Sequence, residues 1–401
     1  MVDNPLTDDA LEEIVSRARK KFAMKPKVAI AGFGKAGKSS LFNAIYGEQL
    51  ARVSMKTDET TAVQTAERFG VDFTDTPGIG TGAFSFEKVL ELAVLDAQHV
   101  VIHVLNGTAA ISADDARLHD AIDRSTAKRL TVVNKADLLD ARERSEVAHS
   151  IEEQLGLGPD DVLFISAKHG IHVARLVEKI ADVLPEAMRD AFVAQQKATL
   201  ALKERRVRAL TLSKAGVCAA IAAAPIPVPD IFVITPIQLA MVTAIGYFHG
   251  VEVGRERALE LMTTLGAGVG LREGARQLLR LVPGYGSAIS AAVAFAGTVA
   301  LGEAANLWFK SRMNMSQEQL RREFGRAAKR AHDEFAAYDA RNARLQERVR
   351  ELEAQCNAGT LSTDEFALAV AQLEAIAPGN DALAEPSAAE TSEEGNGDGG
   401  C

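Results

Sequence analysis

The feature that most constrains this chain is the glycine-rich segment from Gly32 to Ser39, which reads Gly-Phe-Gly-Lys-Ala-Gly-Lys-Ser. It lies between an apolar run at residues 28–31 and a helix-like segment that begins at Ser40. Glycines in this setting let the backbone wrap a polyphosphate, so that amide N–H groups and a helix N-terminus face the anion. Lys38 neutralises phosphate charge and the Ser39 hydroxyl reaches a magnesium ion. The pattern predicts a phosphate-binding loop between a strand and a helix.

Short apolar runs alternate with amphipathic segments from residue 26 to about residue 184. That alternation is typical of a doubly wound α/β fold, in which ligands lie beyond the carboxyl ends of the parallel strands. The expected strands are residues 28–31, 71–74, 100–105, 130–133 and 162–165, with a further one at 62–69.

Polar motifs follow three of these runs. They are Asp75-Thr76-Pro77-Gly78, Asn134-Lys135-Ala136-Asp137 and Ser166-Ala167-Lys168. Each motif is weak alone, but their order along the chain, each at a predicted strand end, argues against a chance match.

The second of these motifs has the chemistry to read guanine. Asp137 can accept two N–H bonds from guanine, from N1 and the exocyclic amino group, a pattern that adenine does not offer. Asn134 is placed for the O6/N7 edge and Lys135 covers the ring, while Ser166 and the Ala167 amide complete the pocket. Because losing a buried bidentate pair is costly, we expect GTP to be strongly preferred over ATP.

With these motifs, residues 26–184 resemble a translation-factor-class GTPase of the Era/TrmE type. The resemblance implies GTP and GDP as ligands, with Mg²⁺. It also implies a second switch at Asp75 and Gly78, where Asp75 holds the magnesium through water and the Gly78 amide meets the γ-phosphate. Thr61, with Thr60 as the alternative, is then the first-switch threonine that closes on magnesium.

The predicted site follows from the motifs and the resemblance together. The nucleotide contacts are Gly32, Gly34, Lys35, Ala36, Gly37, Lys38, Ser39, Ser40, Asp75, Gly78, Asn134, Lys135, Asp137, Ser166, Ala167 and Lys168. The metal set is Ser39, Thr61 and Asp75, and the catalytic set is Lys38, Thr61, Gly78 and Lys35.

The residue after Gly78 departs from the pattern of Ras-like enzymes in a way that affects hydrolysis. Ile79 follows Gly78, where Ras-like enzymes place a glutamine that orients the attacking water, and an isoleucine cannot hydrogen-bond water. We therefore expect slow intrinsic hydrolysis. Relatives with an apolar residue there resemble one another in having a phosphate-loop asparagine that helps recruit potassium, but this chain has Lys35 at that position. Three alternatives stay open: the Lys35 ammonium replaces the monovalent ion, a partner subunit activates the site, or Lys35 only points to solvent.

Composition limits the kinds of partner that we expect. The net charge of the 401 residues is −9 and acidic residues gather at 385–398, so no DNA partner is expected. The three cysteines have no metal-ligand spacing, and the scattered histidines favour structural roles over metal binding. Cysteine usage and the absence of an apolar leader segment predict a cytoplasmic protein.

A helical region follows the GTPase-like region. Residues 231–251 and 281–302 are two uncharged runs whose lengths match a bilayer crossing. They also suit a buried soluble helical bundle, and both interpretations stay open. Residues 215–310 resemble the helical domain of unknown function in YcjF-like bacterial proteins, which implies a membrane-associated role, either peripheral or integral at the inner membrane.

The expected organisation is a P-loop GTPase domain of α/β fold followed by an all-α domain and a helical arm. We expect an N-terminal helix at 1–25, the GTPase domain at 26–184, the apolar helical domain at 185–312, a charged arm at 313–377 and a disordered acidic tail at 378–401. Heptad-like apolar positions predict that the arm forms a hairpin or coiled coil, either self-associating as a homodimer or packing on its own domain. The predicted function is a GTP-hydrolysing switch coupled to a membrane-associated helical domain. The alternatives are a soluble self-assembling switch and a ribosome-assembly GTPase.

Overall fold

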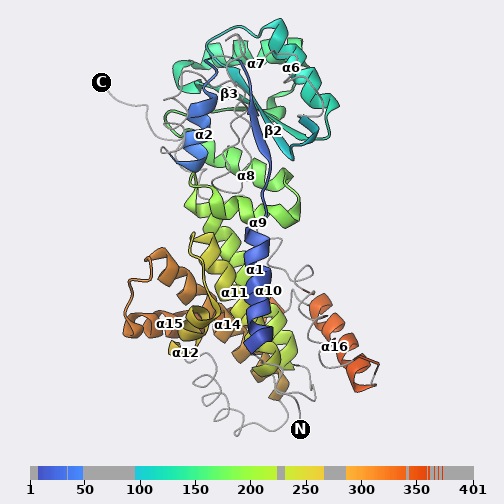
Figure 1. The fold of residues 1–401 in the computed structure, drawn as a ribbon, viewed down its shortest axis with the longest axis vertical. Helices are drawn as coiled ribbons and strands as arrows, with labels where there is room; N and C mark the ends of the chain where they lie inside the picture. Colours follow the sequence, from blue (N-terminus) through green and yellow to red (C-terminus); the bar gives the residue numbers. More distant parts are fainter. Residues whose placement is uncertain are drawn as a thin grey trace, which may run out of the picture. The chain divides into compact units, whose positions relative to one another are not determined.

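The fold is that of a computed structural model, which describes residues 8–33, 35–47, 95–223, 231–265, 286–339 and 343–358, with residues 360, 361, 365, 369 and 373. The chain divides into two compact units, which are shown in Figure 1. One unit is residues 19–203, and the other is residues 1–18 with residues 204–401. Helices α1 (Asp8–Phe22) and α10 (Leu200–Ala223) cross the division.

Residues 19–203 are built on a four-stranded parallel sheet. Its order is β1 (Val28–Ala31), β2 (Val100–Asn106), β3 (Lys128–Asn134) and β4 (Val162–Phe164). Most strand residues are buried, as expected for a parallel sheet covered on both faces. The strands predicted in these four places are therefore confirmed, and so is the α/β fold class. The strands predicted at 62–69 and 71–74 lie outside the described residues.

Five α-helices and two short 3₁₀ turns are described around this sheet. They are α2 (Lys38–Tyr46), α6 (Ala113–Arg124), η2 (Ala136–Leu138), α7 (Ala141–Leu155), η3 (Pro159–Asp161), α8 (Val173–Val183) and α9 (Glu186–Gln195). Ser112 and Asp140 begin α6 and α7 with capping boxes, which satisfy amide groups that a helix start leaves free. Leu118 and Ile122 of α6 pack on Val101 of β2. Apolar residues of α7 pack on β3 in the same way.

The second unit is all-α, as expected. Besides α10, its helices are α11 (Ile231–Phe248), α12 (Arg255–Thr264), α14 (Gly286–Lys310), α15 (Gln317–Asp339) and α16 (Ala343–Asn357). Small residues let these helices approach closely. A Cβ atom built on Gly302 of α14 would lie 2.5 Å from side-chain atoms of Thr211 in α10, so only glycine fits there.

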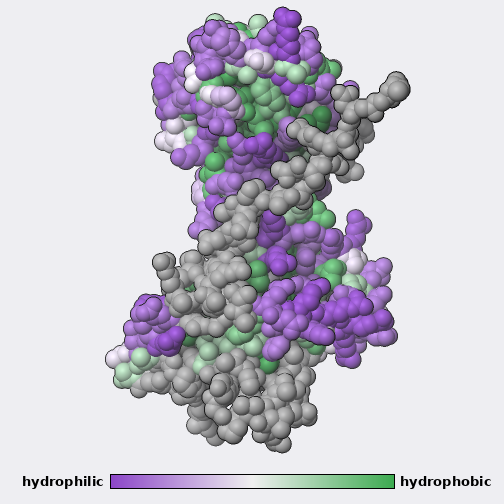
Figure 2. Space-filling model, turned by 180° about the vertical axis from the view of Figure 1, so that it is seen from behind, coloured by the Kyte–Doolittle hydropathy of each residue, from purple (hydrophilic) through white to green (hydrophobic). Residues whose placement is uncertain are grey.

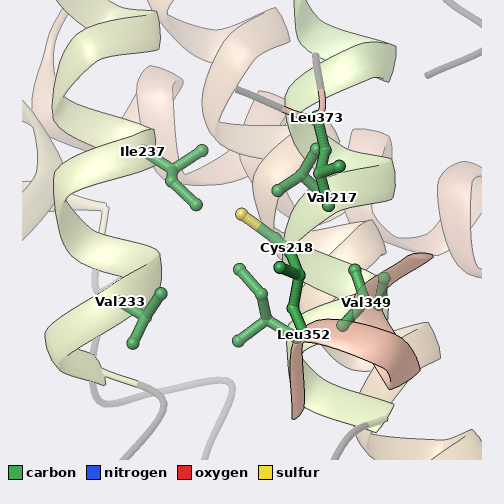
Figure 3. Close-up of a cluster of buried hydrophobic side chains, with 9 residues drawn as sticks. Val217, Cys218, Val233, Ile237, Val349, Leu352 and Leu373 are labelled. Carbon is green, nitrogen blue, oxygen red and sulfur yellow. The ribbon is translucent and has the colours of Figure 1, made fainter. Parts of the chain in front are cut away.

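The charged arm packs back on its own unit. Val349 and Leu352 of α16, with Leu373, join a buried apolar cluster that Figure 3 shows in close-up. The other members of this cluster come from α10 and α11 and include Val217, Cys218, Ile221, Val233 and Ile237. Helix α15 packs instead against α14, where Ala331 joins Phe295 and Val299. Both clusters also contain residues of α10, so the two helices of the arm share this neighbour in the bundle. Packing of the arm on its own unit is one of the two alternatives that the sequence left open.

One apolar stretch of the helical unit meets the length of a membrane span. Among the described residues, the segment Ser290–Lys310 is long and apolar enough to cross a bilayer by length and composition, and 72% of its apolar window is buried inside the protein. A buried core helix of a bundle passes the same test. On the face shown in Figure 2, hydrophilic residues cover much of the described surface, with smaller hydrophobic areas between them.

Candidate nucleotide-binding site

The loop between β1 and α2 folds around the ammonium group of Lys38. Lys38 Nζ donates to the carbonyl oxygens of Gly32, at 2.9 Å, and Phe33, at 3.3 Å, and the side chain is buried. Gly37 precedes α2 in the left-handed conformation, with φ 91°. The N-terminus of α2 therefore opens at this loop, and its first turn carries no acidic residue that would repel an anion.

Two glycines in this loop are required by close approach. A Cβ atom on Gly32 would lie 2.4 Å from the carbonyl oxygen of Val104 in β2, and one on Gly37 would lie 2.2 Å from Nδ2 of Asn134. Both distances are shorter than any normal contact. The glycines thus let the loop pack directly on the carboxyl ends of neighbouring strands.

Asn134, the last residue of β3, ties three loops together. Its Nδ2 donates to the Ala36 carbonyl oxygen at 2.8 Å, and its Oδ1 accepts from the Ala167 amide at 2.9 Å. Its backbone carbonyl accepts from the Gly107 amide at 2.9 Å. The side chain is buried, so both of these side-chain bonds are shielded from water. The phosphate-loop end and the Ser166-Ala167-Lys168 end of the site are therefore fixed relative to each other by one amide.

Asp137 lies beside the loop that follows β4. Lys135 adopts the left-handed conformation, with φ 68°, and turns the chain into η2, which contains Asp137. The Ser166 hydroxyl, hydrogen-bonded to the Asp137 carboxylate, is the largest cause that lowers the pKa of Asp137, while partial loss of solvation acts in the opposite direction. His169 and Lys168 lower this pKa further. The carboxylate is thus held ionised beside the Ser166 hydroxyl, with its side chain 18% exposed.

The comparisons with known proteins agree with this geometry. Residues 27–135 match the family model of the 50S ribosome-binding GTPase, and residues 189–322 match that of a domain of unknown function, DUF697. This chain joins an Era-type GTPase domain to a DUF697 domain. The residues that match the GTPase model contain the phosphate loop and Asn134, and Asp137 lies two residues beyond the match.

Curated relatives match about two fifths of this chain at about 30% identity. GTPase Era of Carboxydothermus hydrogenoformans is 32% identical over 168 residues, which cover 40% of this chain and 55% of the relative. GTPase Der of Kosmotoga olearia is 30% identical over 167 residues, which cover 38% of each chain. The chain thus spans about half the length of such an Era relative, or less for Der.

Two solved structures give weaker matches. The crystal structure of a probable GTP-binding protein engB matches 40% of this chain and 99% of its own, with 18% identity and a TM-score of 0.32. An oligomerised bacterial dynamin pair matches 95% of this chain and 73% of its own, with 15% identity and a TM-score of 0.29. At such TM-scores neither match carries weight for the fold or the function.

The remaining predicted positions in the GTPase domain fall into two groups. Among the described ones, Lys35, Ser40 and Lys168 are exposed, Ser39 is partly buried in the first turn of α2, and Ala36 is buried. Gly34, Thr61, Asp75 and Gly78 lie outside the described residues, as do Thr60 and Ile79. Ser39 is thus the described member of the predicted metal set. Within the part of the chain that the structure describes, no cluster of three or more His, Cys, Asp or Glu side chains is arranged to hold a metal ion.

Sequence reasoning missed two features of this site. It placed Asn134 at the O6/N7 edge of guanine and did not foresee that its amide bridges Ala36 and Ala167. It also assigned His169 no partner, whereas His169 Nε2 lies 3.5 Å from Asp137 Oδ2. The signal available was the position of His169, three residues after Ser166 in a loop expected to border the base.

Proposed function

We propose that this protein is a guanine-nucleotide switch that binds GTP and GDP with Mg²⁺, hydrolyses GTP and passes the nucleotide state to its helical unit. The observation that supports this most is the link through Asn134, which holds the phosphate loop and the base-side loop in one rigid arrangement. The ionised Asp137 carboxylate at the base end supports a guanine reader in particular.

The roles within the site follow from placement and charge. The amides of the phosphate loop and of the first turn of α2 would bind the phosphates, with Lys38 exchanging its carbonyl partners for phosphate oxygens. Asp137 would accept the guanine N1 and exocyclic N–H groups. Ser39, with Thr61 and Asp75, would hold a magnesium ion, which neutralises phosphate charge when bound.

Hydrolysis is proposed to be slow without help. Ile79 offers no hydrogen bond to an attacking water. Lys35 adopts the left-handed conformation, with φ 62°, and is exposed on the phosphate loop, so its ammonium is free to approach a bound polyphosphate. We assign Lys35 the place that a monovalent cation takes in relatives with an asparagine there.

The helical unit is the proposed output of the switch. In this account residues 26–184 bind the nucleotide, residues 185–312 form the helical domain and residues 313–377 form its arm. Membrane contact is a second candidate for the output, and the apolar segment Ser290–Lys310 favours it. The burial of most of that segment favours the soluble alternative, in which the bundle stays closed.

Ribosome binding is a further candidate, because the matching family is described as a 50S ribosome-binding GTPase. The net charge of −9 does not favour a broad, sequence-independent attraction to RNA. Cosedimentation of the full chain with 50S subunits, compared in GDP and in a non-hydrolysable GTP analogue, tests this alternative.

Two experiments test the proposed function. Calorimetry with Mg²⁺ should show binding of GDP and GTP, with ADP and ATP binding at least about a thousandfold more weakly. Flotation with liposomes in GDP and in a GTP analogue then separates the outputs. Nucleotide-dependent flotation supports membrane contact, and nucleotide-dependent dimers without flotation support the soluble switch.

A further inference from the structure

The turn that contains Asp137 is held by hydrogen bonds to both groups of the residue before it. The Ala136 amide donates to the Ile165 carbonyl oxygen, just after β4, at 2.9 Å. The Ala136 carbonyl oxygen accepts from Nη2 of Arg144 in α7, also at 2.9 Å, and from the Leu139 amide at 3.3 Å. Ala136 itself is buried. Arg144 thus supplies a side-chain bond to a turn that is otherwise held by its own backbone.

The start of α7 places Arg144 beside this turn. Asp140 caps the helix, because its carboxylate accepts from the Glu143 amide at 2.8 Å, and the Arg144 amide donates to the Asp140 carbonyl oxygen at 3.0 Å. Side chains of a helix lean towards its N-terminus, so an arginine in the first turn points back to the segment before the helix. The contact between Arg144 and Ala136 therefore follows from the position of Arg144 in α7.

The carbonyl that Arg144 binds belongs to the same peptide unit as the amide of Asp137. A peptide unit is planar, so a bond at its carbonyl oxygen also fixes the direction of its N–H. The Ser166 hydroxyl is the largest cause that lowers the pKa of Asp137, and the Asp137 amide, bonded to the carboxylate of its own residue, lowers this pKa as well. Arg144 therefore acts on the carboxylate through the orientation of one peptide unit.

We propose that Arg144 is a positioning residue for guanine recognition, which aligns the Asp137 carboxylate by holding the Ala136 carbonyl oxygen. This proposal rests on the proposed guanine site. Recognition by two bonds is sensitive to orientation, because both carboxylate oxygens must meet their N–H donors at once. Without Arg144 the Ala136 carbonyl keeps the longer bond from the Leu139 amide. Asp137 should then stay at the site but lose part of the advantage of its second bond to guanine.

The ratio of GDP to IDP affinity isolates this advantage. Both ligands carry the same ribose and phosphates, but inosine lacks the exocyclic amino group and makes one bond fewer to Asp137. A general loss of folding or of phosphate binding lowers both affinities together and leaves their ratio unchanged. A change in the ratio therefore reports the alignment of Asp137.

The test measures this ratio by calorimetry with Mg²⁺ at one pH. In Arg144→Met the ratio should be about fivefold below that of wild type, the size expected when one hydrogen bond is weakened or lost. Arg144→Lys, which keeps a donor on a side chain of similar length, should recover part of the ratio. Arg142→Met is the matched control. Arg142 is an exposed arginine of the same helix that pairs with Glu146 at 2.9 Å, so its ratio should stay within about twofold of wild type.

The outcomes separate this proposal from the proposed function. If wild type prefers GDP over IDP and Arg144→Met keeps the full ratio, the role of Arg144 is wrong and the guanine site stands. The same conclusion follows if Arg142→Met lowers the ratio as much as Arg144→Met, because the effect would then follow the charge of α7 and not the bond to Ala136. If wild type does not prefer GDP over IDP, both proposals are overturned.

Discussion

The Nδ2 atom of Asn134 donates a hydrogen bond to the carbonyl oxygen of Ala36, 2.8 Å away. These residues are 98 positions apart in the chain, yet the bond is buried and joins the end of β3 to the phosphate loop. The same side chain receives the Ala167 amide, so one amide group fixes both ends of the proposed nucleotide site. Preorganisation of this kind reduces the ordering that ligand binding must impose.

Asn134→Ala should therefore weaken both the fold and the site. Losing two buried hydrogen bonds and leaving the Ala167 amide unpaired should cost about 2–3 kcal/mol of unfolding free energy. GDP affinity should fall at least about tenfold, which we would measure by calorimetry. Asn106→Ala is the control, because Asn106 pairs in register with Asn134 but, among the described residues, its side chain accepts hydrogen bonds from Thr108 alone.

Gly37→Ala completes a double-mutant cycle with Asn134→Ala. Alone, it places a Cβ 2.2 Å from Asn134 Nδ2 and strains a left-handed residue. With Asn134 shortened to alanine the clash disappears and only the strain of about 1–2 kcal/mol remains. The double variant should thus lose less stability than the sum of the single variants. The measurement is the thermal unfolding transition, whose midpoint temperature GDP should raise. If the two losses of stability simply add, Gly37 and Asn134 do not contact in solution.

Lys35→Ala should slow GTP turnover about tenfold or more, because a charge proposed to stabilise the developing phosphate charge is removed. Lys35→Asn should recover part of this rate in potassium and not in sodium. Lys128 is an exposed lysine at the opposite end of β3, and Lys128→Ala should change neither the rate of GTP turnover nor its response to potassium. Equal turnover by Lys35→Ala and wild type, with both indifferent to potassium, would remove Lys35 from the mechanism.

Burial of His103 predicts a loss of stability in acid. His103 in β2 is fully buried, neither of its ring nitrogens has a hydrogen-bond partner in the described structure, and it lies near His119 and Arg129. Burial is the main cause that lowers the pKa of His103 to about 3. The folded pKa of His103 lies below the unfolded value. The stability that the folded protein has while His103 is neutral is therefore fully present above about pH 6.5 and is lost as pH falls towards 3. By about pH 5 the loss should be about 2 kcal/mol.

His103→Leu should remove this part of the pH dependence and keep the strand buried. The measurement is the thermal transition of the GTPase domain between about pH 7 and about pH 5. His149→Leu, on the exposed face of α7, should keep the wild-type slope. If the thermal transition of His103→Leu changes with pH as much as that of the wild type, His103 reaches solvent.

A buried polar pair reports whether the apolar helices pack as a bundle in solution. Gln238 Nε2 of α11 donates to Thr298 Oγ1 of α14 at 3.0 Å. Gln238→Leu and Thr298→Val should each destabilise the helical unit by about 1–3 kcal/mol, because each leaves a buried polar partner, and the double variant by less than their sum. The fluorescence of Trp308, the single tryptophan, monitors the unfolding of this unit. No coupling between the two positions would favour an open or membrane-inserted arrangement.

The sequence predicted the four described strands because the signal for them is local. Val28–Ala31 and the loop from Gly32 to Ser39 are read from neighbouring residues, as are the polar motifs that begin at Asn134 and Ser166. The bond from Asn134 to Ala36 depends on tertiary packing between distant segments, which periodicity does not report. For α16 the sequence left self-association and packing on its own unit both open, and the structure shows packing on α10 and α11. The few apolar positions of this helix, among them Val349 and Leu352, serve a coiled coil equally well.

The central claim is that Asp137 reads guanine, and a change of nucleobase preference tests it most directly. In Asp137→Asn, the amide replaces one carboxylate acceptor with an N–H donor, which suits the C2 carbonyl of xanthine and not the amino group of guanine. Calorimetry with Mg²⁺ should show that wild type prefers GDP over XDP and that Asp137→Asn reverses this order, each by at least about a hundredfold. An Asp137→Asn chain that still prefers GDP, or a wild-type chain that gives no heat with either nucleotide, would contradict the account.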